Sequence, residues 1–462
     1  MIRFGTDGVR GLANAELTPE LVMALGRTAA RVLGNGGSGA GNGAAGRRFI
    51  VGRDTRRSGP LLQAALSSGL ASEGVDVTDA GVIATPAVAY LSAEQGVPAA
   101  VISASHNPYW DNGIKFFSAG GAKLPDEVEE AFEAELERLL STLVRPPVPT
   151  RDGVGHISAD AGALSRYQKY VLSCMEGRRL NGLRVALDCA NGAAFASAPA
   201  IFEAAGAQLV EVLAAEPNGL NINDGCGSTD PRRLTETVVT KGADLGLAFD
   251  GDADRVIAVD AGGNLVDGDR LIALFATDLA SRGLLNNATV VVTVMTNLGF
   301  HQAMAAAGVK VHTVSVGDRY VLEALDANGW SLGGEQSGHI IFRSLATTGD
   351  GVLSGVLLAD LVSRRGGPLD ALAGAALQRL PQVLRNVAVA DRDRLAEAAD
   401  VWEEVRRVEA ELGQNGRVLL RPSGTEPLVR VMVEAPTQVE AESSAERIVN
   451  ALQASLGPPV PH

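Results

Sequence analysis

Two stretches of the sequence carry oxygen-bearing side chains at spacings that suit phosphate and metal chemistry. The first is SASHNPYWDNGIKFF at 103–117, which follows an apolar run and contains Ser105, His106 and Lys115. A serine beside a histidine also occurs in hydrolase triads, but no G-x-S-x-G elbow surrounds either serine here. We therefore interpret the stretch as a polar loop with a candidate nucleophile, and a plain turn closed by Asn-Pro is the alternative.

The second stretch is DGDADR at 250–255, directly after the apolar run LGLAF. Its three aspartates, Asp250, Asp252 and Asp254, alternate along the chain, and carboxylates in this pattern can converge on one hard cation such as Mg²⁺. An EF-hand begins similarly, but here its sixth and twelfth positions hold arginine and alanine instead of glycine and an acid. A solvated acidic turn is the alternative, although the apolar run before the loop and the arginine inside it favour a metal site.

A third loop, GGEQSGHIIF at 333–342, places Glu335, Ser337 and His339 ahead of another apolar run. Carboxylate and hydroxyl groups can bind the hydroxyls of a sugar, and a histidine can exchange protons near neutral pH. A buried structural histidine would give the same short pattern, so the loop is weak when it is considered alone.

A fourth loop, RPSGTEPLVR at 421–430, combines hydroxyls, a glycine and two arginines. Backbone N–H groups, hydroxyls and guanidinium groups together can bind a phosphate. The loop lacks the G-x-x-x-x-G-K-[ST] pattern of a P-loop, and an ordinary hairpin turn is the alternative. The groups that could bind the anion are Arg421, Ser423, Gly424, Thr425 and Arg430.

Short apolar runs and helical patterns alternate along the chain, and these elements would position the loops. Such alternation is typical of α/β domains with largely parallel sheets, in which ligands bind beyond the ends of the strands. Three strand-loop-helix units, beginning at FIVG, RVALD and TVVVT, suggest related domains, although any α/β protein shows some likeness of this kind. We expect strands at 49–52, 99–104, 184–188, 244–250 and 289–295, and helices at 60–74, 127–140 and 196–206.

A chain of 462 residues is too long for one ordinary core, so we expect several domains. The segment RPPVPTRDG at 145–153 reads as a linker, and the Gly-rich segment at 34–46 reads as a surface loop. After about residue 370 the pattern changes to two strands within 417–435 and a helix at 440–453, which predicts a smaller α+β domain. The expected domains are 1–150, 151–256, 257–370 and 371–462.

The composition narrows the classes of function. A formal net charge of −14 disfavours nonspecific nucleic-acid binding, which requires Lys and Arg to neutralise phosphates. No run of 18 apolar residues occurs, so we expect no membrane span, and the N-terminal residues lack the apolar core of a signal peptide. Three widely spaced cysteines form neither a metal motif nor a disulfide framework, which indicates a reducing cytoplasm.

Together and in this order, the four loops resemble the α-D-phosphohexomutase superfamily, from FGTDGVRG near the N-terminus to RPSGTEPLVRVM near the C-terminus. Within the superfamily the chain looks most like the phosphoglucosamine mutases, because of FGTDGVRG, SASHNPYWDNGIKFF, GDRYV at 317–321 and Gln336 in GEQSGH. The resemblance implies three related α/β domains with mixed sheets and a smaller C-terminal α+β domain, arranged around a central cleft.

The resemblance also implies roles for individual residues. Ser105 matches the phosphoserine, and with the three aspartates it would bind one Mg²⁺ per subunit. Ser103 stands where the superfamily often has threonine, so it is the weaker candidate for the nucleophile. The implied catalytic residues are Ser105, His106, Lys115, Arg10 and His339, and the implied substrate-binding residues are Arg255, Glu335, Ser337, Arg421, Ser423, Gly424, Thr425 and Arg430.

The implied reaction interconverts glucosamine 6-phosphate and glucosamine 1-phosphate through glucosamine 1,6-bisphosphate, which would also act as an activator. Its product would feed the synthesis of UDP-N-acetylglucosamine and cell-wall precursors, and a homodimer is common in the resembling family. A phosphoglucomutase or phosphomannomutase is the nearest alternative. A phosphatase that uses an aspartate of DGDADR as its nucleophile and a non-catalytic sugar-phosphate binding protein are alternatives from other classes.

Overall fold

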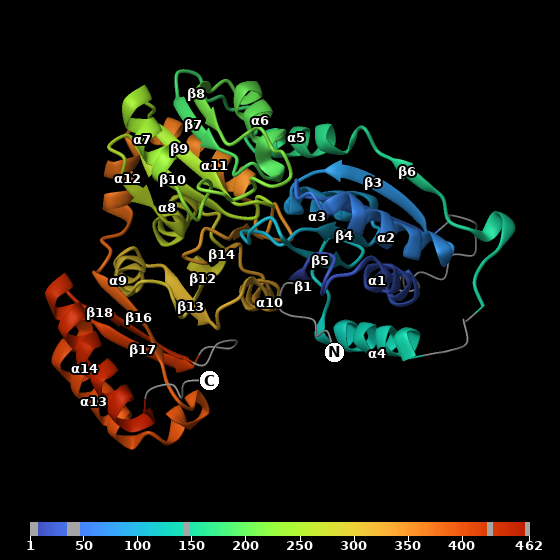
Figure 1. The fold of residues 1–462 in the computed structure, drawn as a ribbon. Coiled ribbons are helices and arrows are strands. Elements are labelled where there is room, and N and C mark those ends of the chain that lie inside the picture. Colours follow the sequence, from blue (N-terminus) through green and yellow to red (C-terminus); the bar gives the residue numbers. More distant parts are fainter. Residues whose placement is uncertain (1–7, 35–46, 142–146, 423–427, 458–462) are drawn as a thin grey trace. The chain divides into compact units, whose positions relative to one another are not determined.

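The structure is a computed structural model that describes residues 8–34, 47–141, 147–422 and 428–457. These residues form two compact units, one made of 1–295 with 309–374 and the other of 296–308 with 375–462. The strands assemble into separate sheets, which follow one another along the sequence (Figure 1). No helix in the described ranges is long and apolar enough to cross a membrane.

The first sheet of the larger unit has the order β1-β5-β4-β2-β3-β6. Strands β4, β2, β3 and β6 run parallel, whereas β5 is antiparallel to both of its neighbours. The strands are β1 (Val9–Leu12), β2 (Arg48–Arg53), β3 (Asp76–Val82), β4 (Ala99–Ile102), β5 (Asp111–Phe117) and β6 (Ile157–Ala159). The accompanying helices are α1 (Pro19–Val32), α2 (Gly59–Ser72), α3 (Thr85–Gln95) and α4 (Asp126–Ser141).

Side chains of β2 alternate between the two faces of this sheet, as the period of two in a strand requires. Phe49 and Val51 are fully buried in the core that includes residues of α1 and α2. Gly52 faces the other side, where a Cβ atom would lie 2.6 Å from Val88 of α3. Helices therefore cover both faces of this sheet. The polar loop after β4 lies at the end of the sheet, beyond the faces on which these helices pack.

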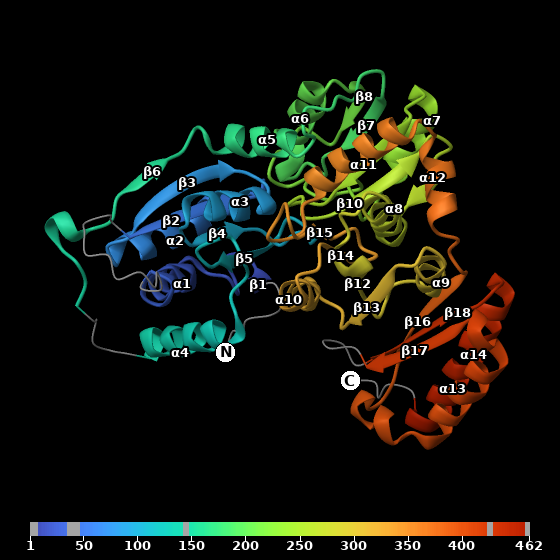
Figure 2. The same ribbon diagram turned by 180° about the vertical axis from the view of Figure 1, so that it is seen from behind.

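The second sheet has the order β11-β10-β9-β7-β8 and the third has the order β13-β12-β14-β15. Helix α11 packs against β9 and β10 of the second sheet (Figure 2). The strands are β7 (Arg184–Asp188), β8 (Gln208–Leu213), β9 (Leu245–Phe249), β10 (Val256–Asp260), β11 (Leu265–Val266), β12 (Thr289–Thr293), β13 (Lys310–Val314), β14 (Leu332–Gly334) and β15 (Ile340–Phe342). The helices of this part are α5 (Ala163–Ser173), α6 (Ala198–Ala205), α7 (Arg232–Lys241), α8 (Gly268–Ser281), α10 (Asp318–Asn328), α11 (Gly351–Arg365) and α12 (Leu369–Ala376).

The three sheets share one arrangement of strands. In each, a central parallel strand (β2, β7 or β12) lies between two parallel neighbours, and an antiparallel strand (β5, β10 or β15) follows the second neighbour in both sequence and space. The loops that carry Ser105, Asp250 and Glu335 all occupy this reversal from a parallel to an antiparallel strand. The sequence suggested three related α/β domains, and the three sheets indeed share one topology.

The second unit is a three-stranded antiparallel sheet in the order β16-β18-β17, with two long helices packed on it. Helix α9 belongs to the same unit, because the buried carboxylate of Glu434 accepts hydrogen bonds from Leu298 N at 2.8 Å and from Asn297 Nδ2 at 3.2 Å. Arg417 Nε donates to the same carboxylate at 2.8 Å. The elements are α9 (Leu298–Ala306), β16 (Gln382–Ala388), α13 (Ala399–Leu412), β17 (Arg417–Pro422), β18 (Leu428–Glu434) and α14 (Gln438–Leu456).

The expected strands and helices are present, with ends that shift by a few residues, and the predicted change to an α+β pattern near the C-terminus is confirmed. The domain limits stay predictions. The limit between 256 and 257 falls at the start of β10, which pairs with β9 in the second sheet, and β6 beyond residue 150 still pairs with β3. Nearly all of the Gly-rich segment, residues 35–46, lies outside the described residues.

Asp350 is a buried carboxylate at the N-terminus of α11, and its ionisation affects the stability of the fold. Its carboxylate caps α11 by accepting from Leu353 N at 2.9 Å, and it also accepts from the hydroxyl of Tyr167 at 2.9 Å. Burial raises the pKa of Asp350 to about 6, although these hydrogen bonds oppose the shift. In the unfolded chain the pKa is about 3.9, so the folded state binds the proton more tightly and its stability falls between about pH 4 and about pH 6.

We predict that Asp350→Asn, which keeps an acceptor and a helix cap but never ionises, removes this loss of stability. The difference in unfolding free energy, variant minus parent, should be about 3 kcal/mol larger at pH 7 than at pH 4. A pKa difference of about two units between the folded and unfolded states corresponds to about that value. Denaturant unfolding at both pH values measures the difference. A change in unfolding free energy that is equal at the two pH values would contradict the prediction.

Candidate active site

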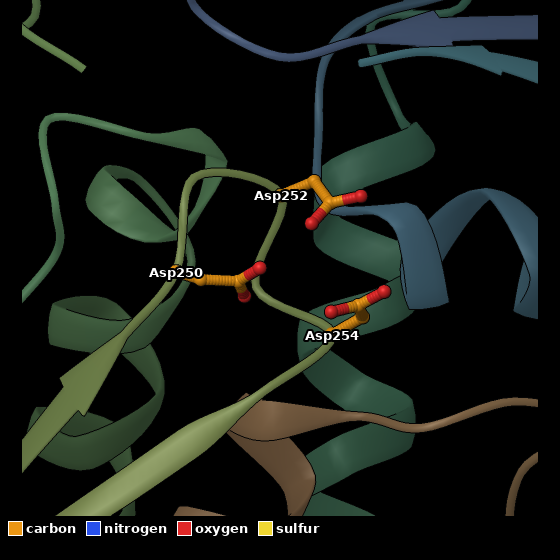
Figure 3. Close-up of side chains that lie close together, drawn as sticks. All are labelled: Asp250, Asp252 and Asp254. Carbon is orange, nitrogen blue, oxygen red and sulfur yellow. The ribbon is translucent and has the colours of Figure 1, made fainter. Parts of the chain in front are cut away.

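The turn between β9 and β10 carries the three aspartates, which follow one another along the loop (Figure 3). Asp250 and Asp252 are fully buried and Asp254 is 4% exposed. The chain reverses at Ala253, whose φ of 60° lies in the left-handed region. One carboxylate oxygen of each aspartate can be chosen so that the three atoms lie within 4.8 Å of one another. The reversal therefore brings three carboxylates together in a buried place.

Two other elements secure this aspartate turn. At the start of α3, Thr85 N donates to Asp252 O at 2.9 Å, and Thr85 Oγ1 donates to Asp252 Oδ2 at 2.7 Å. At the start of α11, Gly351 N donates to Ala253 O at 3.0 Å. A Cβ atom at position 351 would lie 2.3 Å from Arg255 O, so only glycine permits this approach of helix to turn. The turn is thus held by the N-terminal ends of helices α3 and α11 as well as by its own strands.

The charges around the turn are strongly coupled. Lys115 Nζ, on β5, lies 3.1 Å from Asp252 Oδ2 and 3.2 Å from Asp254 Oδ2. Burial raises the pKa of Asp250 well above its ordinary value, and the neighbouring carboxylates of Asp254 and Asp252 raise it further. Burial acts in the same direction on Asp254, but Lys115 and His339 outweigh it and hold the pKa of Asp254 well below its ordinary value. Lys115 and His339 thus offset part of the negative charge of the three aspartates.

The free oxygens of the turn fit a metal ion. Asp252 Oδ1 and Asp254 Oδ1 are buried, and neither has a hydrogen-bond partner among the described residues. A buried carboxylate oxygen without a partner is costly, and a cation would satisfy it. All the donors are oxygens, which hard divalent cations prefer. The triad can therefore bind a metal, and Mg²⁺ is consistent with its donor set.

Ser105 meets this turn from the first sheet. Its backbone is in the left-handed region, with φ 51°, and its Oγ donates to Asp250 Oδ2 at 2.6 Å. His106 Nδ1 lies 3.4 Å from the same Oγ. Ser103, by contrast, donates its hydroxyl to Asp54 Oδ2 at 2.6 Å and accepts from Ser105 N at 2.9 Å. The geometry supports Ser105 over Ser103 as the candidate nucleophile.

His106 lies in a positively charged surrounding. Burial lowers its pKa, and the nearby guanidinium groups of Arg255 and Arg10 lower the pKa further. Arg10 is on β1, where it stands opposite Gly113 of β5. The imidazole of His106 is therefore neutral at pH 7 and is able to accept a proton.

His339 follows the turn between β14 and β15 and is almost fully buried. Gly349 N donates to its Nε2 at 3.1 Å, so the ring proton of the neutral form is on Nδ1, which lies 3.7 Å from Asp254 Oδ2. Burial lowers the pKa of His339, but Asp254, Asp318 and Glu335 outweigh burial and raise it. In the neutral form that the hydrogen bond from Gly349 N requires, His339 directs its Nδ1 proton toward the aspartate turn, and its raised pKa makes it a stronger base than an ordinary histidine.

The other predicted residues of the third loop lie near these charges. Glu335 is half-buried, and its Oε1 accepts from Gly317 N at 3.1 Å. Arg255 Nε lies 3.7 Å from Asp254 Oδ1, and although burial lowers its pKa, the carboxylates of Asp254, Asp250 and Glu335 raise it overall. Ser337 is exposed on the same turn as Glu335. The larger unit thus assembles most of the predicted residues around the aspartate turn.

The fourth loop belongs to the second unit, and Ser423, Gly424 and Thr425 lie outside the described residues. Arg421 and Arg430 stand directly opposite each other on β17 and β18, at the base of the loop. Burial lowers the pKa of Arg421, and the charge of Arg430 lowers it further. Like charges in directly opposite positions destabilise a strand pair, and an anion between them would relieve the repulsion.

Sequence reasoning missed several residues that position the site. Thr85, Asp54, Arg56 and Asn223 hold the aspartate turn or the serine loop through hydrogen bonds. The run FIVGRDTR at 49–56 contains Asp54 and Arg56 and predicts only a strand that ends in a polar loop, because nothing in these residue types marks them as positioning residues.

Comparison with known proteins agrees with this geometry. Family models of the phosphoglucomutase/phosphomannomutase domains match most of the chain, with α/β/α domain I at residues 1–142, domain II at 165–263, domain III at 267–380 and the C-terminal domain at 384–451. The phosphoglucosamine mutase of Mycolicibacterium paratuberculosis is 51% identical over 98% of this chain and 99% of its own length. That of Rhodococcus opacus is 52% identical over 96% and 98%, respectively. The chain belongs to the phosphoglucosamine mutase family.

Solved structures show the same fold as this phosphoglucosamine mutase family member. A phosphoglucomutase/phosphomannomutase family protein from Burkholderia thailandensis superposes with a TM-score of 0.78 at 24% identity, over 97% of each chain. The N-acetylphosphoglucosamine mutase of Aspergillus fumigatus, solved with GlcNAc-6P and magnesium, has a TM-score of 0.70 at 18% identity, over 99% of this chain and 96% of its own. The four-domain architecture and the α/β fold expected from the sequence are confirmed.

We predict that Asp252→Asn weakens metal binding by this phosphoglucosamine mutase family member at least about tenfold. The substitution keeps the volume but removes one charge from the oxygen cluster, and charge is the main source of affinity for a hard cation. Calorimetric titration with Mg²⁺ measures the dissociation constant. Asp224→Asn, at an exposed position in a neighbouring loop, is the matched control and should bind as the parent does. Equal affinities of Asp252→Asn and the parent would contradict the role of the triad.

Proposed function

We propose that the chain interconverts glucosamine 6-phosphate and glucosamine 1-phosphate, with Ser105 as the phosphate carrier. The observation that carries the proposal is the position of Ser105 Oγ, 2.6 Å from Asp250 Oδ2 at the edge of the buried triad. Phosphoryl transfer depends mainly on positioning and charge neutralisation, which a serine beside a metal-binding carboxylate cluster can obtain. The membership in the phosphoglucosamine mutase family supports the same conclusion.

In the proposed cycle the enzyme begins with a phosphate on Ser105. The free hydroxyl of the bound sugar phosphate attacks this phosphorus, the bond to Ser105 Oγ breaks, and the hydroxyl proton passes to a base. The product of this half-reaction is glucosamine 1,6-bisphosphate, which then returns its other phosphate to Ser105. A Mg²⁺ bound by Asp250, Asp252, Asp254 and an oxygen at Ser105 would supply charge neutralisation for the transferred group.

The chain's own residues would handle the protons and the remaining charge. Lys115 Nζ is fixed between two carboxylates, which suits it to donate a proton, and the raised pKa of His339 suits it to take up a proton and return it. His106 is neutral and adjacent to Ser105 Oγ, which suits it to accept one. Arg255 and Arg10 add positive charge on the same side. Each of these assignments is part of the proposal.

The proposed sugar contacts rest on the third loop. Gln336 Nε2 is buried and has no hydrogen-bond partner within the described part of the chain, so it can donate to a sugar oxygen. Glu335 offers its second carboxylate oxygen, and Ser337 is exposed beside it. An amino sugar is positively charged at its nitrogen, and Glu335 would favour it over a neutral hexose.

The finer features of the proposal rest on the resemblance to the family and on the composition of the chain. We expect one Mg²⁺ per subunit, activation by glucosamine 1,6-bisphosphate, a homodimer, and a cytoplasmic enzyme whose product feeds the synthesis of UDP-N-acetylglucosamine and cell-wall precursors. A sugar phosphate is the proposed small-molecule partner. Neither a nucleic acid nor a membrane is required by this chemistry.

The decisive experiment is turnover of glucosamine 1-phosphate with Mg²⁺ and a trace of glucosamine 1,6-bisphosphate. We expect kcat/KM for this substrate to exceed that for glucose 1-phosphate and mannose 1-phosphate, because Glu335 and Gln336 distinguish the amino sugar. Ser105→Ala should lose nearly all activity while its circular dichroism is unchanged. A higher kcat/KM for glucose 1-phosphate or mannose 1-phosphate would contradict the amino-sugar assignment. An active Ser105→Ala variant would contradict the role of Ser105 as the phosphate carrier.

The fourth loop provides a separate prediction. Arg421 presents a planar fork that suits two phosphate oxygens, and one hydrogen bond to a charged group contributes about 1.5–3 kcal/mol. We expect Arg421→Ala to raise KM about tenfold or more, since 1.4 kcal/mol corresponds to a factor of ten. Phosphorylation of Ser105 should change less, because the loop would hold the phosphate that does not react.

The matched control for this loop is Arg394→Ala, which removes an exposed arginine elsewhere in the second unit. Its KM should equal that of the parent. If Arg421→Ala also turned over substrate with the parent's KM, the loop would be only a hairpin turn.

A further inference from the structure

Arg56 is a buried arginine that binds the backbone of the serine loop. Its side chain is 0% exposed, and its Nη2 donates to Ser105 O at 2.8 Å and to Asn107 O at 2.9 Å. Its Nη1 donates to Pro108 O and, at 3.2 Å, to Asp111 O. One guanidinium group therefore donates hydrogen bonds to four carbonyl oxygens, three in the loop between β4 and β5 and one at the first residue of β5.

Arg56 also forms an ion pair with the carboxylate of Asp54. Arg56 Nε donates to Asp54 Oδ2 at 2.8 Å, and Asp54 is likewise 0% exposed. That oxygen also accepts from Ser103 Oγ at 2.6 Å, and Ser103 Oγ in turn accepts from Ser105 N at 2.9 Å. Both the N–H and the C=O of Ser105 are thus connected to one buried ion pair at the end of β2.

A neighbouring loop of the second sheet repeats the contact. Asn223 Nδ2 donates to Ser105 O at 2.9 Å and to Asn107 O at 3.1 Å, which are the oxygens that Arg56 Nη2 also binds. Ser105 has a φ of 51°, a conformation that costs free energy in a residue with a side chain. The surrounding hydrogen bonds hold it there, and its Oγ consequently meets Asp250.

We propose that Arg56, with Asp54 and Ser103, is a positioning device for phosphoryl transfer that holds Ser105 in its left-handed conformation against the aspartate turn. The inference rests on the proposed function, because it concerns the residue that would carry the phosphate. Arg56 is a positioning residue and makes no contact with the reacting atoms, since its donors are used by Asp54 and the loop carbonyls. Its planar fork reaches acceptors on two sides, which a lysine ammonium cannot reproduce.

A positioning role predicts a split between kinetic constants. Loosening the serine loop misplaces the phosphate but leaves the sugar-binding residues of the third loop intact, so kcat should fall while KM stays nearly constant. A merely structural role would lower the unfolding midpoint and leave the kcat of the folded enzyme unchanged. The two roles can therefore be distinguished in one set of variants.

The experiment uses the full chain labelled on Ser105 with glucosamine 1,6-bisphosphate carrying ³²P. Single-turnover transfer from Ser105 to glucosamine 1-phosphate, steady-state kcat and KM, and the unfolding midpoint are measured for each variant. We expect Arg56→Lys to slow transfer and kcat about 100-fold, the effect that a misplacement of about 1 Å can produce, with KM within about twofold of the parent. Arg57→Lys, at the exposed neighbouring position, is the matched control and should behave as the parent does.

Two milder variants keep the proposal testable if Arg56→Lys fails to fold. Ser103→Ala removes the connection from Asp54 to Ser105 N, and Asn223→Ala removes the second donor to the loop carbonyls; each should slow single-turnover transfer about tenfold, the effect of losing about 1.4 kcal/mol. Parent-like transfer in these two variants, or in a folded Arg56→Lys, would overturn the inference alone. A parent enzyme that acquires no label on Ser105 would overturn the proposed function and, with it, this inference.

Discussion

The larger unit depends on one constraint, the balance of three buried carboxylates in a single turn. Asp250, Asp252 and Asp254 can remain buried only if positive groups approach them. Those groups come from separate places in the sequence: Lys115 from β5, and His339 from the turn before β15. Because Lys115 belongs to the first sheet, the aspartates to the second and His339 to the third, these charge contacts join the three sheets at one turn.

The repeated strand order explains why chemistry gathers at this place. In each of the three sheets a parallel strand is followed by an antiparallel neighbour, and the connection between them is a short polar turn. Such a reversal exposes backbone groups and side chains at the end of the sheet, whereas helices cover its faces. Three copies of one topology therefore place Ser105, the aspartate triad and the proposed sugar-binding residues at equivalent positions.

Much of this could be predicted from the sequence. The alternation of apolar runs predicted the strands, and the spacing of the aspartates predicted a metal site. The resemblance to the phosphohexomutase superfamily singled out Ser105 and His339. The residues that position them could not be found this way. Arg56 and Asn223 bind backbone carbonyls, and every residue has a carbonyl, so no residue type marks the acceptor. Thr85 meets Asp252 across 167 positions, and only the tertiary arrangement brings such residues together.

The hydrogen bond between Ser105 and Asp250 spans 145 positions, and the turn that holds Asp250 is itself secured by Gly351. Contacts of such long range form late, because the entropy of closing the intervening chain must be overcome first. During synthesis, N-terminal domains fold as they leave the ribosome. The serine loop can thus be complete in sequence and local structure while the nascent protein is still inert. The arrangement around the aspartate turn is therefore assembled only after the third sheet has been synthesised, because Gly351 follows β15 in the sequence.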